Sequence, residues 1–145
     1  MELSCKREYA MLALLALATH YTQGEPRQIR QIACEQNIPD RYLEQLLATL
    51  RRGGLVRSQR GAKGGYFLAR EPWKITLLEV VECIEGLNDR ASTAKSSGKT
   101  IESAIVREIW QEVRQTTHSV LQKYTLQDLK EQRDTRQQLD IMYYI

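Results

Sequence analysis

Apolar residues recur at helical spacing through the first 20 residues of the chain. Ser4 is a suitable N-cap for a helix that runs to about His20, and this helix should be largely buried. Its apolar face is expected to contain Tyr9, Leu12, Leu15 and Ala16, widened by Leu14 and Leu17.

The next two helices are short and close together. The pattern predicts one over Arg27 to Gln36 and another from about Asp40 to Arg52. Asn37-Ile38-Pro39 separates them, because Asn tolerates the left-handed conformation at a helix end and Pro suits the start of a helix. Two short helices joined by a tight turn are typical of a helix-turn-helix, and the small Ala33 lets them cross closely. The inner stripe of the second of these helices is Leu43, Leu46, Leu47 and Leu50.

Glycines and short apolar runs then predict a β-hairpin. Gly53-Gly54 stops the third helix, and strands are expected over Leu55 to Arg60 and Tyr66 to Ala69, with a glycine-rich tip at 61–65. Thr76-Leu77-Leu78-Glu79 has the form of a capping box, so a fourth helix should run from there to about Glu85.

The second half of the chain has a different pattern. Asn88 to Lys99 contains no large apolar residue, and we expect a flexible loop. Helical spacing returns from Ile101 to Tyr124, about 36 Å of helix at 1.5 Å per residue. Thr125-Leu126-Gln127-Asp128 suits the cap of a short last helix, and we expect the polar tail Gln132 to Asp140 to be frayed.

The long helix carries an apolar stripe that we expect to be buried against another surface. Packing within one chain is one explanation, but the helix is longer than a small domain covers. A second copy of the chain would bury the stripe, and two-fold dimers are the commonest assembly. The expected dimer interface is Ile101, Ile105, Ile109, Trp110, Val113, Val120 and Tyr124.

Charge is distributed unevenly along the 145 residues. Residues 1–70 carry 11 Lys and Arg against 6 Asp and Glu, a net charge of +5, whereas residues 71–145 carry 10 against 12, a net charge of −2. A basic half is suited to an acidic polymer such as DNA. Hydrophobic residues make up 42% of the chain and charged residues 27%, as in ordinary globular domains.

Cysteine usage and hydropathy indicate the compartment. Cys5, Cys34 and Cys83 are few and far apart, which argues against a disulfide framework and for a reducing cytoplasm. We interpret them as small buried hydrophobic residues, with a thiol switch as the alternative. The apolar stretch Met11 to Ala18 is too short for a membrane span of about 20 residues, so we expect a cytoplasmic protein with no membrane partner.

The third predicted helix presents polar side chains on its first turns. Arg can donate two hydrogen bonds to guanine, Gln can pair with adenine, and Glu can accept from cytosine. A recognition helix contacts bases mainly through its first turns. The alternative is a plain helix pair with a solvated charged face. The candidate base-reading residues are Arg41, Tyr42, Glu44 and Gln45.

The basic hairpin favours the DNA-binding interpretation. Glycines let a backbone approach a phosphate strand closely, and Arg60 is the candidate for insertion into the minor groove, where negative potential is concentrated. A nucleotide-binding loop is disfavoured, because the chain lacks the Gly-x-x-x-x-Gly-Lys-Ser/Thr pattern here. Further candidate DNA contacts are Lys6, Arg7, Arg51, Arg52, Arg57, Gly61 and Lys63.

These elements predict a mainly α fold with a small β-hairpin wing. The expected organisation is a winged helix-turn-helix DNA-binding domain over residues 1–87 and a flexible loop over 88–100. A dimerisation helix with a C-terminal tail follows over 101–145.

Several motifs coincide with these elements. They are Lys6-x-x-Tyr9-Ala10, Tyr42-Leu43-Glu44-Gln45-Leu46-Leu47, Gly54-Leu55-Val56, and Arg60-Gly61 followed by Gly64-Gly65-Tyr66. Over about residues 1–131 the chain closely resembles the bacterial winged-helix family of IscR and NsrR. The resemblance implies a homodimeric transcription regulator with a long C-terminal dimer helix. It also implies base contacts from Arg41, Tyr42, Glu44 and Gln45 and minor-groove contact from Arg60.

The chain departs from the family's pattern at one site. Many members bind an iron–sulfur cluster through three cysteines in the loop before the long helix, with a histidine near its start as a further ligand. Clusters normally need Cys thiolates, with His as an occasional substitute. We therefore expect no cofactor. Aligned through Trp110, the corresponding positions here are Ser92, Gly98, Ala104 and Arg107.

The leading hypothesis is a dimeric transcription regulator, a repressor by family analogy, that binds double-stranded DNA at a pseudo-palindromic operator. One alternative is a winged-helix module that binds protein; another is a redox or iron–sulfur sensing regulator with non-standard ligands. The chain has neither His-Glu-x-x-His nor Gly-x-Ser-x-Gly, which argues against an enzyme. The sequence does not identify a small-molecule effector.

Overall fold

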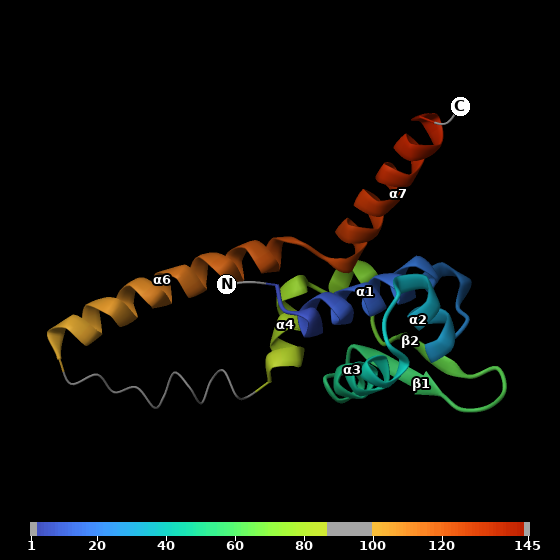
Figure 1. Ribbon diagram of the computed structural model, residues 1–145, viewed down its shortest axis with the longest axis horizontal. Helices are drawn as coiled ribbons and strands as arrows, with labels where there is room; N and C mark the ends of the chain where they lie inside the picture. Colours follow the sequence, from blue (N-terminus) through green and yellow to red (C-terminus); the bar gives the residue numbers. More distant parts are fainter. Residues whose placement is uncertain (1–2, 87–99, 144–145) are drawn as a thin grey trace.

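Four helices pack around a single apolar core in the N-terminal part of the protein. The computed structural model describes residues 3–86 and 100–143. Helix α1 runs through the centre and contacts the other three and also helix α7 (Figure 1). The helices of this part are α1 (Cys5–Thr19), α2 (Ile29–Gln36), α3 (Asp40–Arg52) and α4 (Leu77–Glu85), with 3-10 helices η1 (Tyr21–Gln23) and η2 (Pro72–Lys74).

Helix α1 buries only part of the predicted face: Leu14, Ala16 and Leu17 are buried as expected. Ser4 caps it as expected, since its Oγ accepts a hydrogen bond from the backbone N of Arg7 at 3.2 Å. Tyr9, Leu12 and Leu15 are only partly buried. The shift arises because alanines let three neighbouring helices approach α1 closely from several sides. Its buried residues are Ala10, Ala13, Leu14, Ala16, Leu17 and Ala18.

The helix-turn-helix forms as predicted, apart from its first residues. Asn37 ends α2 in the left-handed conformation, with φ 55° and ψ 50°. Ala33 is buried on the inner face of α2, and the four leucines of the predicted inner stripe of α3 are buried. The prediction that α2 begins at Arg27 was wrong, because the backbone of Arg27 is paired with Tyr66 instead.

The wing is a two-stranded antiparallel hairpin that is shorter than predicted. Strand β1 (Val56–Gln59) pairs with β2 (Gly65–Leu68), from Val56 opposite Leu68 to Gln59 opposite Gly65. Arg27 flanks the other side of β2: its N donates to the carbonyl O of Tyr66 at 2.8 Å, and the N of Tyr66 donates to its carbonyl O at 2.7 Å. A Cβ on Gly65 would lie 2.4 Å from that carbonyl O of Arg27, so this approach requires glycine.

Helix α4 follows the wing and begins where the capping pattern predicts. Thr76 Oγ1 accepts a hydrogen bond from the backbone N of Glu79 at 3.2 Å, while the carboxylate of Glu79 pairs with Arg70. The predicted flexible loop, Asn88 to Lys99, lies outside the described residues.

Two C-terminal helices project from the domain (Figure 1). Helix α6 (Ile101–Lys123) contacts α4, and α7 (Leu126–Tyr143) contacts α1 and η2. Thr125 and Asp128 cap α7 reciprocally, with N–O distances of 2.9 and 3.3 Å. The prediction of a frayed tail after a short last helix was wrong, because α7 continues to Tyr143. None of the described helices combines the length and apolarity needed to cross a membrane.

The cysteines are less buried than predicted. Cys5 and Cys34 are exposed, and Cys83 is partly buried on α4. The Sγ of Cys83 donates to the carbonyl O of Thr49 at 3.5 Å, and a Cβ on Gly53 would lie 2.2 Å from this sulfur. Glycine at the end of α3 therefore lets α4 approach. Burial raises the pKa of the Cys83 thiol above its ordinary value, although Arg52 opposes the effect.

In the folded protein we expect iodoacetamide to modify Cys83 more slowly than Cys5 and Cys34, because the thiolate is the reactive form. Mass spectrometry of peptides from a time course at pH 8 measures the three rates, and full denaturation should bring them together. Because folding raises the pKa of Cys83, stability should also fall as the pH rises through its ionisation. Modification of Cys83 at the rate of Cys5 in the native state would contradict this description.

Candidate nucleic-acid interface

The exposed face of α3 carries three of the four predicted base-reading side chains. Arg41, Glu44 and Gln45 are exposed, and their spacing places them on one face of the helix. No ion pair within residues 3–86 and 100–143 engages Arg41 or Glu44, so both charges are available. The ring of Tyr42 is partly buried, edge-on to Tyr9 at a centroid distance of 5.4 Å. This contact anchors the start of α3 to α1.

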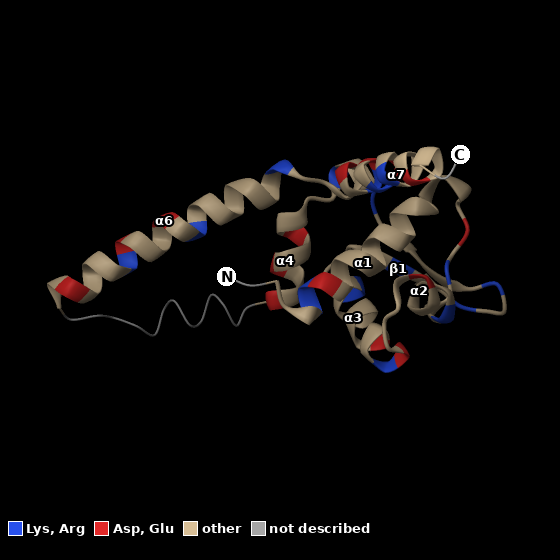
Figure 2. Cartoon of the chain, turned by 45° about the horizontal axis from the view of Figure 1, so that its top comes forward, with Lys and Arg blue, Asp and Glu red and all other residues tan. Residues whose placement is uncertain are grey.

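The wing presents the basic residues expected of it. Arg57, Arg60 and Lys63 are exposed, and Figure 2 shows basic positions along the hairpin loop. Gly61 has φ +112°, a conformation that favours glycine. A Cβ on Gly64 would lie 2.1 Å from the carbonyl O of Gln59, so the tip is a tight turn. The wing thus holds three cations on a compact ribbon.

The remaining predicted phosphate contacts differ in their surroundings. Lys6 is exposed, whereas Arg7 forms an ion pair with Glu85. Arg51 and Arg52 are exposed at the end of α3, and Nη1 of Arg51 donates to Oγ of Ser58 on β1 at 3.2 Å. The pairing of Arg7 reduces the charge available for a phosphate, and its assignment stays a prediction.

The structure adds one cation that the sequence analysis missed. Arg30 is exposed on the first turn of α2, away from the buried stripe of that helix. Its position on roughly the opposite side of the helix from Ile32 was the available signal. It extends the set of exposed cations to the first helix of the helix-turn-helix.

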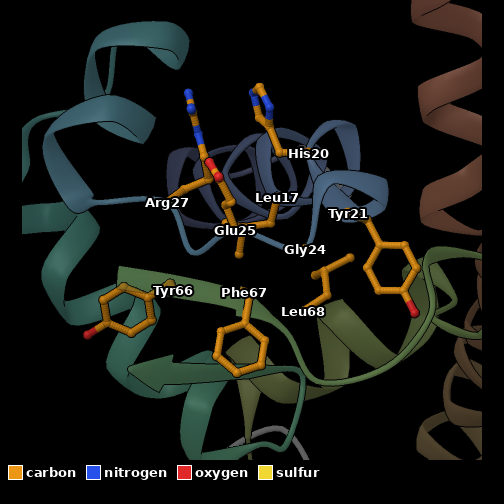
Figure 3. Close-up of a pocket in the computed structure, with 9 residues that line it drawn as sticks. All are labelled: Leu17, His20, Tyr21, Gly24, Glu25, Arg27, Tyr66, Phe67 and Leu68. Carbon is orange, nitrogen blue, oxygen red and sulfur yellow. The ribbon is translucent and has the colours of Figure 1, made fainter. Parts of the chain in front are cut away.

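A small cavity of ≈ 70 Å³ lies where the end of α1, the segment before α2 and strand β2 meet. Figure 3 shows His20 and Arg27 extending to the same side of it. Both approach Glu35: the carboxylate pairs with Arg27 and lies 3.6 Å from Nε2 of His20. Ligand pockets for drug-sized molecules occupy about 300–1,000 Å³, so this cavity does not define an effector site.

The described residues do not fit an iron–sulfur cluster. No three His, Cys, Asp or Glu side chains gather as metal ligands within residues 3–86 and 100–143. Ala104 and Arg107 lie on the first two turns of α6 and supply neither thiolate nor imidazole. Ser92 and Gly98, the other two aligned positions, lie outside the described residues.

The fold and the site define the class of this protein. A helix-turn-helix with an exposed polar recognition face, joined to a basic two-stranded wing, is the architecture of a winged helix-turn-helix DNA-binding protein.

Comparison with known proteins identifies the family. The model of the Rrf2 family, described as an iron-dependent transcriptional regulator, matches residues 3–132. The chain is 35% identical over 145 residues to the HTH-type transcriptional regulator CymR of Bacillus subtilis, which covers 100% of both chains. The chain belongs to the Rrf2 family and is a DNA-binding transcription regulator, not an enzyme. This confirms the predicted fold class and the resemblance.

Solved structures support the same conclusion. The structure of T. potens IscR matches with a TM-score of 0.78 and 33% identity, over 94% of this chain and 91% of that chain. The structure of CymR, the global cysteine regulator of B. subtilis, matches with a TM-score of 0.73 and 34% identity. The match covers 90% of this chain and 97% of that chain. The matches therefore include the C-terminal helices as well as the winged domain.

We expect Arg60→Ala to weaken operator binding by about 1–3 kcal/mol, because it removes the wing cation that is predicted to enter the minor groove. Fluorescence anisotropy with a duplex selected by the parent protein measures the change. Arg114→Ala removes an equal charge from α6 and should change affinity less than about twofold. If Arg60→Ala binds as tightly as the parent, the assignment of the wing is wrong.

Proposed function

We propose that this regulator acts as a homodimer and represses transcription from a pseudo-palindromic operator. The observation that carries the dimer is the uncovered apolar stripe of α6. Ile109 is 56% exposed and Trp110 60%, and no residue of α6 is buried within the single chain. A contiguous exposed apolar surface of this kind is typical of a protein interface.

The stripe runs along most of α6. Ile101 at its beginning is 78% exposed and Val106, which the sequence analysis left out of the interface, is 63% exposed. Two antiparallel or crossed copies of this helix would remove the stripe from water at a gain of about 25 cal/mol per Å² of apolar area. The other members are Ile105, Val113, Val120 and Tyr124, all of them exposed.

A dimer matches the DNA-binding function. It would present two α3 helices and two wings, and helix-turn-helix dimers read half-sites about 34–36 Å apart. We assign base contacts to Arg41, Glu44 and Gln45 and the minor-groove contact to Arg60. The repressor assignment rests on the resemblance to the family. We place the protein in the cytoplasm, where its DNA target lies.

A protein-binding winged helix is the competing function, and salt dependence separates the two. Binding through several phosphates releases counterions, so affinity for duplex DNA falls steeply with salt. A protein-binding module would bind no duplex at any salt concentration. The exposed cations of α3 and the wing favour DNA over a protein partner.

We expect Ile109→Glu to dissociate the dimer, because it places an unpaired charge within the stripe. The free energy of dimerisation should become less favourable by about 3 kcal/mol, which raises the dimer Kd on the order of 100-fold. Light scattering after size exclusion should give twice the 16.8 kDa chain mass for the parent and the single mass for the variant.

The matched control is Gln111→Glu, which adds the same charge two residues along, on roughly the opposite side of the helix. It should remain dimeric. A monomeric parent, or an unaffected Ile109→Glu dimer, would show that the stripe is not the interface.

We also propose that no iron–sulfur cluster occupies the family's usual site, because Ala104 and Arg107 supply no ligand. Protein purified without oxygen should show no visible charge-transfer absorbance and no stoichiometric iron. Absorbance bands together with stoichiometric iron would mean that other residues, such as the three cysteines, hold a cluster.

A further inference from the structure

Gln28 lies between the helix-turn-helix and the tip of the wing. Its backbone N donates a hydrogen bond to Oε1 of Gln31 at 3.0 Å, which caps the start of α2. Its side chain has two roles: it accepts from the backbone N of Gln31 in the capping box of α2, and its Nε2 donates to the carbonyl O of Ala62 at 3.4 Å. Ala62 belongs to the wing tip, between Arg60 and Lys63. One residue therefore connects the first helix of the motif to the basic end of the hairpin.

Away from its tip, the wing is joined to the rest of the domain by the buried Val56 and Leu68 and by several polar contacts. The Arg27–Tyr66 backbone pair holds strand β2. Arg51 at the end of α3 donates to Ser58 on β1. These contacts locate the base and the middle of the hairpin relative to α2 and α3, and the contact of Gln28 locates the tip.

The turn at the tip is closed by its own hydrogen bond, from the backbone N of Gly64 to the carbonyl O of Gly61 at 2.9 Å, which does not join it to the helices. Gly61, Ala62 and Lys63 are all exposed, so no apolar burial fixes their position. An isolated two-stranded hairpin is marginally stable in water, and a polar contact at its end limits the directions the tip samples. A contact that holds a binding loop in its bound position improves affinity by reducing the ordering cost of binding.

We propose that Gln28 is a positioning residue that sets the place of the wing tip relative to the recognition helix. Through this contact it determines how well the wing reads the DNA flanking the half-site. Gln28 acts through Arg60 and Lys63 and not by touching the bases. The inference rests on the proposed role of the wing as the minor-groove contact.

The contact with Ala62 can be separated from the capping of α2 by comparing two variants. Gln28→Met keeps the length of the side chain but removes the donor to Ala62 together with the side-chain half of the capping box that Gln28 supplies. Gln31→Met removes the other half of the capping box and leaves the donor of Gln28 in place. Comparison of these variants separates a role in wing position from a role in α2 stability.

The test uses the full-length chain and a duplex that the parent protein enriches from a random library. Affinities are measured for this duplex and for duplexes with one base pair changed at each position. For Gln28→Met we expect roughly three- to tenfold weaker binding, the effect of one net hydrogen bond. Discrimination should fall at the flanking positions and persist at the positions read by α3. The Tm of this variant should fall no further than that of Gln31→Met, because each variant removes one half of the same capping box.

Gln31→Met should also lower the Tm, but it should leave discrimination at the flanks unchanged, because the donor of Gln28 to Ala62 remains. The inference is overturned if Gln28→Met keeps parental discrimination at the flanks, or if Gln31→Met reproduces its loss. If Arg60→Ala also leaves the flanks unaffected, the proposed role of the wing fails together with the inference. If Arg60→Ala removes flank discrimination and Gln28→Met does not, only the inference fails.

Discussion

The backbone pairing between Arg27 and Tyr66 joins the two parts of the DNA-binding unit. Two short hydrogen bonds make the segment before α2 a partner of strand β2, although 39 residues separate them in the chain. The pairing requires the glycine at position 65, since a side chain there would clash with the carbonyl of Arg27. It places the wing beside the helix-turn-helix, so that both present their polar surfaces together.

The core around α1 makes this arrangement rigid. The alanines of α1 let α2, α3 and α4 contact it, and the leucines of α3 are buried against this centre. Burial of one face of α3 leaves Arg41, Glu44 and Gln45 exposed on the other. The candidate recognition surface is therefore a consequence of core packing: the side chains that stabilise the helix and those proposed to contact DNA occupy opposite faces.

The two C-terminal helices differ in how they relate to the domain: α7 packs against it, whereas α6 carries an exposed apolar stripe. Helix α7 is attached to the domain through the buried Leu126 and through Arg133, whose Nη1 donates to Oγ1 of Thr19 at 3.2 Å. Helix α6 leaves its apolar stripe uncovered by the single chain. In our proposal a second copy covers this stripe, which would connect the oligomeric state to the reading of a two-fold symmetric DNA site.

The sequence by itself determined the elements whose signals are local. Periodicity placed α3 at its observed residues, Asn37 and Pro39 marked the turn, and Thr76 marked the start of α4. The exposure of Arg41, Glu44 and Gln45 followed from helix periodicity, because the apolar stripe of α3 leaves one face to solvent, whereas the partial burial of Tyr42 depended on Tyr9. The Gln, Arg and Leu residues between Gln132 and Leu139 are good helix formers and were a local signal for the longer α7. The polarity of this segment led instead to the prediction of a frayed tail.

Only the tertiary structure decided which elements approach one another. It set the start of α2, because the backbone of Arg27 forms hydrogen bonds with Tyr66 instead of joining the helix. It chose the buried face of α1, which depends on where three other helices lie, and it left Cys5 and Cys34 exposed. Local propensity acts over a few residues, whereas burial and strand pairing depend on partners far away in the chain, and no local pattern specifies those partners.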